Sequence, residues 1–188
     1  MNNQTQNPID LVLAESLKEL ATKKPIDKIT IKEITDKAGV IRPTFYNHFQ
    51  DKYELLEWIT VNELFAPVEP LLANGMFKEA VTFTLTALEK EKSFYLRAIQ
   101  LEGQNSFNQI FDRCVQNAIA SNINVEKLSQ VVPYSWLNER HVAEFFANSI
   151  TWATIEWIKH DMRVPVSEMA DVYLKIFHNP ILESVAKF

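Results

Sequence analysis

The sequence contains few of the residues that interrupt or cross-link a chain. It has three glycines and one cysteine among 188 residues. A single cysteine excludes a disulfide within the chain and fits a reducing compartment, so Cys114 is interpreted as a small buried hydrophobic residue. Apolar residues recur with a helical period almost throughout, and strand-like alternation is not apparent. These features favour an all-α fold.

Several functional signals are also missing. The sequence has no run of about 18 apolar residues, the length that a membrane-spanning helix needs, and its first eight residues do not resemble a secretory signal. We therefore expect a cytoplasmic protein. It contains no glycine-rich phosphate loop, nucleophile elbow or metal-ligand spacing. These absences argue against an enzyme, and no cofactor or metal is expected.

The charge is unevenly distributed along the chain. The net charge is −5, yet residues 1–52 hold eight Lys and Arg against seven Asp and Glu. The remaining residues hold eleven against seventeen. A hydrophobic content of 47% is sufficient for a substantial core. This balance fits a small region that contacts nucleic acid on an acidic body, although charge alone does not establish DNA binding.

One stretch predicts a short helix with well-defined ends. Thr30 and Glu33 have the spacing of a capping box, and Ile29 and Ile34 have the spacing of a hydrophobic staple. The helix should therefore begin at residue 30 or 31. Gly39 supplies the left-handed residue that commonly ends a helix.

A second short helix should follow this turn. Pro43 fits its first turn, which places Arg42 at or near the cap. Phe45 and Phe49 are four residues apart and should face the core. The remaining surface of the helix then carries groups that can donate to phosphates or base edges, namely Arg42, Thr44, Tyr46, Asn47 and His48.

This stretch resembles the DNA-binding domain of the TetR family of transcriptional regulators. The resemblance rests on residues 30–52, above all on the run Thr44-Phe-Tyr-Asn-His-Phe49 followed by Asp51-Lys52. It implies a three-helix helix-turn-helix domain over residues 1–52 and a helical regulatory and dimerisation domain over residues 53–188. One departure is Ile41, which stands where the family often has a small hydroxyl residue.

The resemblance implies a function and a set of contacts. A homodimeric, sequence-specific regulator, by family default a repressor, would bind a palindromic operator and be released by an effector in the C-terminal domain. The C-terminal half faintly resembles the branch associated with dihydroxyacetone kinase operons, in which a partner protein can replace a small-molecule effector. Arg42 is expected to contact a base edge, and Tyr46, His48, Thr30 and Lys52 to contact phosphates. The full expected set is Thr30, Arg42, Pro43, Thr44, Tyr46, Asn47, His48 and Lys52.

Helical patterns continue along the rest of the chain. Asn7 and Pro8 should begin the first helix. Asp51 and Glu54 have the spacing of a capping box and should begin a fourth helix, which Pro67 and Pro70 kink or end. Further helices are expected over 76–90, from Ser93 to Gly103, over 107–118, over 138–160 and near 166–177, with a loop over 121–137.

The helix over 138–160 is apolar on nearly every side, so it should be buried on more than one face. Pairing the last two helices with those of a second copy would achieve this. Aromatic residues are candidates for lining a ligand cavity, although such residues more often form plain core: Phe94, Tyr95, Phe145 and Trp152. The alternative function is a helical protein-interaction module whose helix-turn-helix no longer binds DNA.

Overall fold

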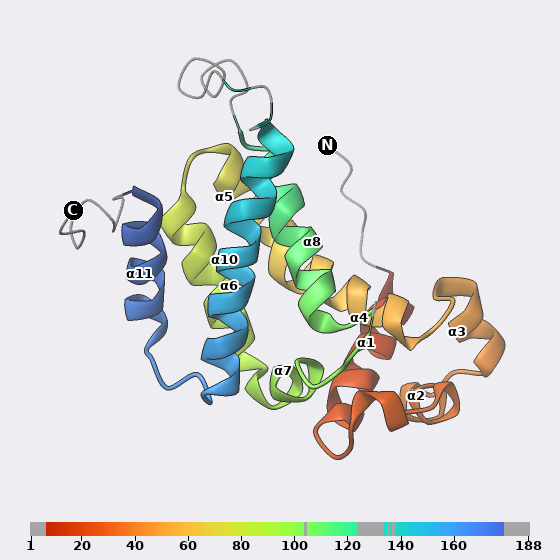
Figure 1. Cartoon of the computed structure of the whole chain (residues 1–188). Coiled ribbons are helices and arrows are strands. Elements are labelled where there is room, and N and C mark those ends of the chain that lie inside the picture. The colour runs from red at the N-terminus through yellow and green to blue at the C-terminus, as the bar shows by residue number, and fades with distance from the viewer. Residues whose placement is uncertain (1–6, 104, 124–133, 135, 137, 179–188) are drawn as a thin grey trace.

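The computed structural model describes residues 7–178 except 104, 124–133, 135 and 137, and side chains up to residue 175. Within these residues every regular element is helical, which confirms the predicted all-α class. Figure 1 shows two parts, a head built from the N-terminal helices and a larger body beside it. We call residues 7–52 the head and residues 53–178 the body. None of the described helices is both long enough and apolar enough to cross a bilayer.

The head contains three helices and a 3₁₀ turn, and α4 leads from it into the body (Figure 1). The elements of the head are α1 (Pro8–Ala21), η1 (Ile26–Lys28), α2 (Ile31–Ala38) and α3 (Arg42–His48), and α4 (Lys52–Thr60) follows them. The body continues with the π-helical turn η2 (Val61–Phe65), the 3₁₀ turn η3 (Ala66–Val68), α5 (Glu69–Ala73), α6 (Phe77–Lys90), α7 (Lys92–Ala98), α8 (Phe107–Ala120), α10 (Glu139–Lys159) and α11 (Val166–His178).

Local signals in the sequence set the beginnings of several helices. Asn7 caps α1, because its side-chain oxygen accepts a hydrogen bond from the backbone N–H of Ile9 at 3.0 Å. Asp51 caps α4 by accepting from the N–H groups of Tyr53 and Glu54. The Glu54 carboxylate accepts from the N–H of Gln50, whereas in a capping box it would accept from the N–H of Asp51.

The head and the body share one continuous apolar core. Leu13, Leu17, Ile34 and Phe45 of the head have no exposed surface, and neither does Leu55 of α4 in the body. In the body, α8 lies along α10 and α6 lies along α11, while α7 contacts both α1 and α10. Burial of these apolar faces fixes the head against the body.

Two predicted helix boundaries are wrong. The helix expected from Ser93 to Gly103 is α7, which begins at Lys92 and ends at Ala98. Glu91 ends α6 and caps α7 at the same time, so Ser93 is already inside the helix. Gly103 lies in the following loop with a φ of 95°, which glycine adopts without strain.

The regular part of α4 ends at Thr60, earlier than expected. Pro67 has no N–H to donate to the carbonyl four residues before it, and its ring crowds that carbonyl. The chain therefore passes through the π-helical and 3₁₀ turns before α5, which has Pro70 in its first turn.

Most of the segment expected as a loop, 121–137, lies outside the described residues.

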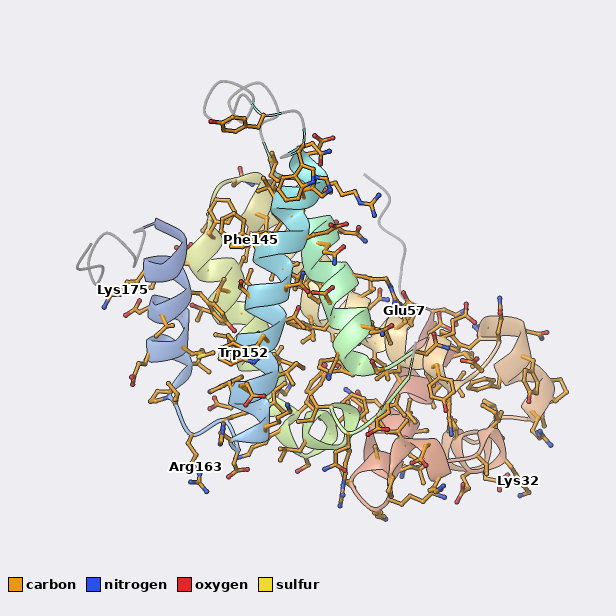
Figure 2. The ribbon with its side chains drawn as sticks, viewed as in Figure 1. Lys32, Glu57, Phe145, Trp152, Arg163 and Lys175 are labelled. Carbon is orange, nitrogen blue, oxygen red and sulfur yellow. The ribbon has the colours of Figure 1, made fainter. Side chains whose placement is uncertain are left out.

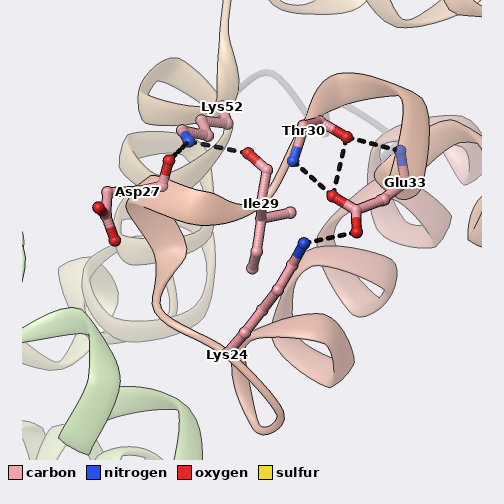
Figure 3. A network of polar contacts seen from close by, with 6 residues as sticks. All are labelled: Lys24, Asp27, Ile29, Thr30, Glu33 and Lys52. Atoms are coloured by element: carbon pink, nitrogen blue, oxygen red, sulfur yellow. Dashed lines mark hydrogen bonds and ion pairs between the residues drawn. The ribbon is translucent and has the colours of Figure 1, made fainter.

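The start of α2 carries the capping box that the sequence predicted (Figure 3). The Glu33 carboxylate accepts from the Thr30 N–H at 2.9 Å and from the Thr30 hydroxyl at 2.8 Å. The same hydroxyl accepts from the Glu33 N–H at 3.3 Å. Lys24 also donates to Glu33, and its hydrogen bond, together with those from Thr30, lowers the pKa of Glu33 to about 2.

Replacing Glu33 by glutamine should remove an acid-sensitive part of the stability. Because the folded-state pKa of Glu33 is lowered to about 2 from 4.5, its contribution is fully present above pH 4.5 and is lost as the pH falls toward 2. The difference in free energy of unfolding between wild type and Glu33→Gln should therefore shrink across this range, which urea unfolding at several pH values measures. Glu79→Gln is the control, since Glu79 is also the third residue of its helix but follows an uncapped start. A Glu33→Gln difference that stays constant down to pH 3 would contradict the assignment.

Candidate nucleic-acid interface

The α2–turn–α3 unit is held rigidly on its inner side. Gly39 ends α2 in the left-handed conformation, with a φ of 69°, and Val40 and Ile41 lead directly into α3. Phe45 is fully buried and Phe49 is 4% exposed, which confirms that these rings face inward. The two rings contact each other, with centroids 5.9 Å apart. This packing determines which side of α3 faces solvent.

The outer side of α3 is polar and accessible. Arg42, Pro43 and Asn47 are exposed, Tyr46 is 51% exposed, and Thr44 is partly exposed. Together they present a guanidinium, a phenol, an amide and a hydroxyl on one short helix at the edge of the head (Figure 1). Groups of this kind donate to phosphate oxygens and to base edges in a major groove.

The side chain of His48 is less exposed than the sequence indicated, and it has a partner within the head. Its Nδ1 atom lies 2.6 Å from a carboxylate oxygen of Asp10, and the two side chains are only 20% and 17% exposed. The contact ties the end of α3 to the first turn of α1. A phosphate contact by His48 has to use the other ring nitrogen, Nε2. Sequence reasoning missed Asp10, which stands 38 residues away along the chain.

Lys52 also has partners within the head (Figure 3). Its ammonium group donates to the backbone carbonyls of Asp27 at 2.6 Å and Ile29 at 2.8 Å. Burial lowers the pKa of Lys52, and the nearby Asp27 carboxylate offsets part of that shift. An ammonium has three donors, so two hold the start of α4 against η1 and one is left for a phosphate. The Thr30 hydroxyl likewise has partners within the head, because it takes part in the capping box.

The body contains a cavity of about 320 Å³. It lies between α6, α8, α10 and α11, and residues of the turns after α4 close one side of it. None of the four aromatic residues suggested as ligand contacts lines it. Phe94 and Tyr95 are fully buried in α7, while Phe145 and Trp152 are 68% and 69% exposed on the outer face of α10 (Figure 2). The aromatic residues that do line it are Phe65, Phe77, Phe111, Phe146 and Tyr173.

Comparison with known proteins matches both parts of the chain to transcriptional regulators. A family model described as bacterial regulatory proteins of the tetR family matches residues 14–59, and one described as a transcriptional regulator C-terminal region matches residues 77–179. The HTH-type dhaKLM operon transcriptional activator DhaS of Lactococcus lactis subsp. lactis (strain IL1403) is 23% identical over 147 residues, which are 78% of each chain.

Solved structures share the fold over nearly the whole chain. A TetR-family transcriptional regulator from Syntrophomonas wolfei str. Goettingen superposes with a TM-score of 0.67 at 14% identity, covering 96% of both chains. FadR of Thermus thermophilus, a TetR-family repressor solved with lauroyl-CoA, superposes with a TM-score of 0.60 at 18% identity. The superposition covers 89% of this chain and 92% of that one.

The family matches begin in the helices of the head and continue through the helices of the body. They agree with the exposed polar helix, the capped turn and the all-helical body described above. The chain belongs to the TetR family of transcriptional regulators.

Proposed function

We propose that the chain is a homodimer that binds a palindromic operator through its two α3 helices and is released by an effector bound in the body. The observation that carries the proposal is the outer face of α3, which is polar and exposed while Phe45 and Phe49 hold the inner face in the core. We assign residues 1–52 to DNA binding and residues 53–188 to regulation and dimerisation. A helix held this way is the element that a helix-turn-helix protein inserts into the major groove.

The contacts of α3 are proposed from the position of each side chain. Arg42, at the start of the helix, would donate to a guanine edge, and Thr44 and Asn47 would contact neighbouring bases or phosphates. Tyr46 and the Nε2 atom of His48 would contact phosphates. Pro43 shapes the first turn, and Thr30 and Lys52 would add phosphate contacts only through the donor capacity that their internal hydrogen bonds leave.

The outer face of α10 supports dimerisation through the last two long helices. Phe145 and Trp152 are two turns apart and point away from the body (Figure 2), with exposed fractions of 68% and 69%. Val172 of α11 is 40% exposed. Large aromatic residues exposed in this way mark a contact surface. A second copy packed on the same face would bury them and form a two-fold four-helix interface.

An ion cluster ties α1 to the π-helical turn η2, which follows α4. The ammonium of Lys18 is 2.7 Å from Glu15, 2.9 Å from Glu63 and 3.8 Å from Glu91, although Lys18 is only 5% exposed. Burial lowers the pKa of Lys18, but its hydrogen bonds to Glu15 and Glu63 raise it more, so the pKa lies above its ordinary value. Burial also raises the pKa of Glu63, which Lys18 offsets in part. Separating Lys18 from Glu63 would leave the nearly buried ammonium poorly solvated and without this partner.

The same π-helical turn reaches both the head and the cavity. Glu63 of this turn pairs with Lys18 of α1, whereas Phe65, two residues later, lines the cavity. The carbonyl of Leu64 accepts a hydrogen bond from Thr84 of α6 at 3.2 Å. We therefore propose that an effector in the cavity acts on this turn, shifts α4 and changes the spacing of the two α3 helices.

We propose repression, in which the bound dimer blocks transcription until the effector releases it. Activation is the second candidate, because the Lactococcus lactis relative is named an activator of the dhaKLM operon. Expression of a reporter behind the footprinted operator, with and without the gene for this chain, separates the two. Deletion should raise expression under repression and lower it under activation.

Arg42→Ala should relax base preference at one position of each operator half-site. Loss of a bidentate contact to guanine costs roughly 1–3 kcal/mol of discrimination, or about fivefold to 150-fold in affinity ratio. Footprinting the DNA that flanks the coding region would locate the operator, and titration of single-base variants measures the preference. Arg163→Ala, which removes an exposed arginine far from the head, is the control (Figure 2).

An unchanged base preference in Arg42→Ala would remove Arg42 from the interface. No protected site for the wild-type protein at low salt would instead favour the interaction module that does not bind DNA.

Trp152→Glu should convert the dimer into a monomer, because a charge at the centre of an apolar interface loses its hydration without gaining a partner. Sedimentation velocity measures the oligomeric state, and operator affinity should fall with it. Phe83→Glu is the control, since Phe83 is a large apolar residue that is 42% exposed on α6, which is not one of the two proposed interface helices. Dimerisation that survives Trp152→Glu but not Phe83→Glu would place the interface elsewhere.

A further inference from the structure

We propose that the cavity of the body binds a neutral, largely apolar small molecule with at most one uncharged polar group, which lies at the cavity mouth. The ligand class is inferred from the cavity walls, and only its regulatory consequence rests on the proposed function. A volume of about 320 Å³ is in the range of small-molecule sites.

The inner walls of the cavity are apolar. Helix α6 contributes Val81 and Leu85, and α8 contributes Phe111 and Val115. Leu85, Phe111 and Val115 are almost completely buried, so their side chains are fixed by the core around them. A ligand inside therefore gains affinity by removing apolar surface from water.

The few polar groups in the walls already have partners. The Thr84 hydroxyl donates to the carbonyl of Leu64, and the Thr154 hydroxyl donates to the carbonyl of Ile150 at 2.8 Å. The hydroxyls of Thr154 and Tyr173 are 2.7 Å apart and hydrogen-bonded. Burial raises the pKa of Tyr173 to about 12, so this phenol is neutral. A ligand with several hydroxyl groups would lose its water without replacing those hydrogen bonds.

No charged side chain lines the cavity among the residues that the structure describes. Charged residues on the same helices are paired outside it: Lys78 of α6 with Asp171 of α11 at 2.9 Å, and Asp112 of α8 with the hydroxyl of Thr151 at 3.1 Å. An ionised carboxylate or phosphate between these walls would thus be buried without a counter-charge, which is strongly unfavourable, and at the open end it would gain no counter-charge from the residues that line the cavity. This excludes anionic ligands as the preferred class.

One end of the cavity is open to solvent. Phe77 is 45% exposed there, and Asn122 is exposed at the end of α8. The Asn122 NH₂ group donates to the carbonyl of Ala118 at 2.8 Å, which holds its amide in place beside the walls. A single hydroxyl or amide on the ligand would lie at this mouth, within reach of water and the Asn122 side chain.

Displacement of a neutral fluorescent probe tests the ligand class on the full chain. N-phenyl-1-naphthylamine should bind with enhanced fluorescence, and decan-1-ol should displace it at a concentration at least about tenfold lower than decanoate does. Glycerol, which is small and has three hydroxyl groups, should not displace it. Equal or stronger displacement by decanoate would overturn the proposal, as would failure of the probe to bind.

Three substitutions test where the probe binds. Ala118→Trp fills the cavity and should weaken probe binding at least about tenfold, whereas Ala120→Trp, exposed on the same helix, should leave it unchanged. Phe77→Lys, at the exposed mouth, should bring decanoate close to decan-1-ol in the concentration that displaces the probe, because it supplies the missing counter-charge. This variant retains the test if Ala118→Trp does not fold, as judged by circular dichroism. Probe binding that Ala118→Trp leaves intact in a folded protein, or Phe77→Lys that leaves the preference unchanged, would also contradict the proposal.

Binding of the footprinted operator by the same preparation is measured separately. A protein that binds the operator but not the probe refutes the ligand class alone. One that binds the probe but no DNA refutes the proposed regulatory function alone.

Discussion

The position of the α3 helix relative to the body depends on one helical run, α4 with the π-helical turn after it. At its start, the Lys52 ammonium holds α4 to two backbone carbonyls of the head. At its end, Glu63 pairs with Lys18, a nearly buried lysine of α1. Both contacts are charge-assisted hydrogen bonds, which are stronger and more directional than neutral ones. A rotation of this run would move the head as one piece instead of deforming it.

We propose that the cavity controls such a rotation through the π-helical turn. Phe65 belongs both to the π-helical turn and to the cavity wall, so filling the cavity and moving the head involve the same few residues. A ligand shifts an equilibrium only by its difference in affinity for the two states. Moving a population from 1:99 to 99:1 requires a preference of about 5.5 kcal/mol. A ligand held by the apolar walls shifts the equilibrium by this amount only if the second state closes or reshapes the cavity.

The sequence predicted those features that depend on residues close together in the chain. The Thr30–Glu33 box, the left-handed Gly39 and the inward pair Phe45 and Phe49 follow from spacing and were found as predicted. Contacts between distant residues were not predictable: Asp10 with His48, and Lys52 with the carbonyl of Asp27. The cavity was missed for the same reason. Aromatic residues at helical spacing have the same pattern whether they face a core, solvent or a cavity, as Tyr95, Trp152 and Phe146 show.

We propose that a ligand in the body changes the separation of the two α3 helices in one dimer. Spin labels placed at Gln50→Cys in a Cys114→Ser background, next to α3 and exposed, allow that separation to be measured by pulsed dipolar spectroscopy. With operator DNA, the distance between labels should centre near the groove spacing of roughly 34–36 Å, and decan-1-ol should lengthen it and lower operator affinity. A distance distribution that decan-1-ol leaves unchanged while it fills the cavity would contradict the account.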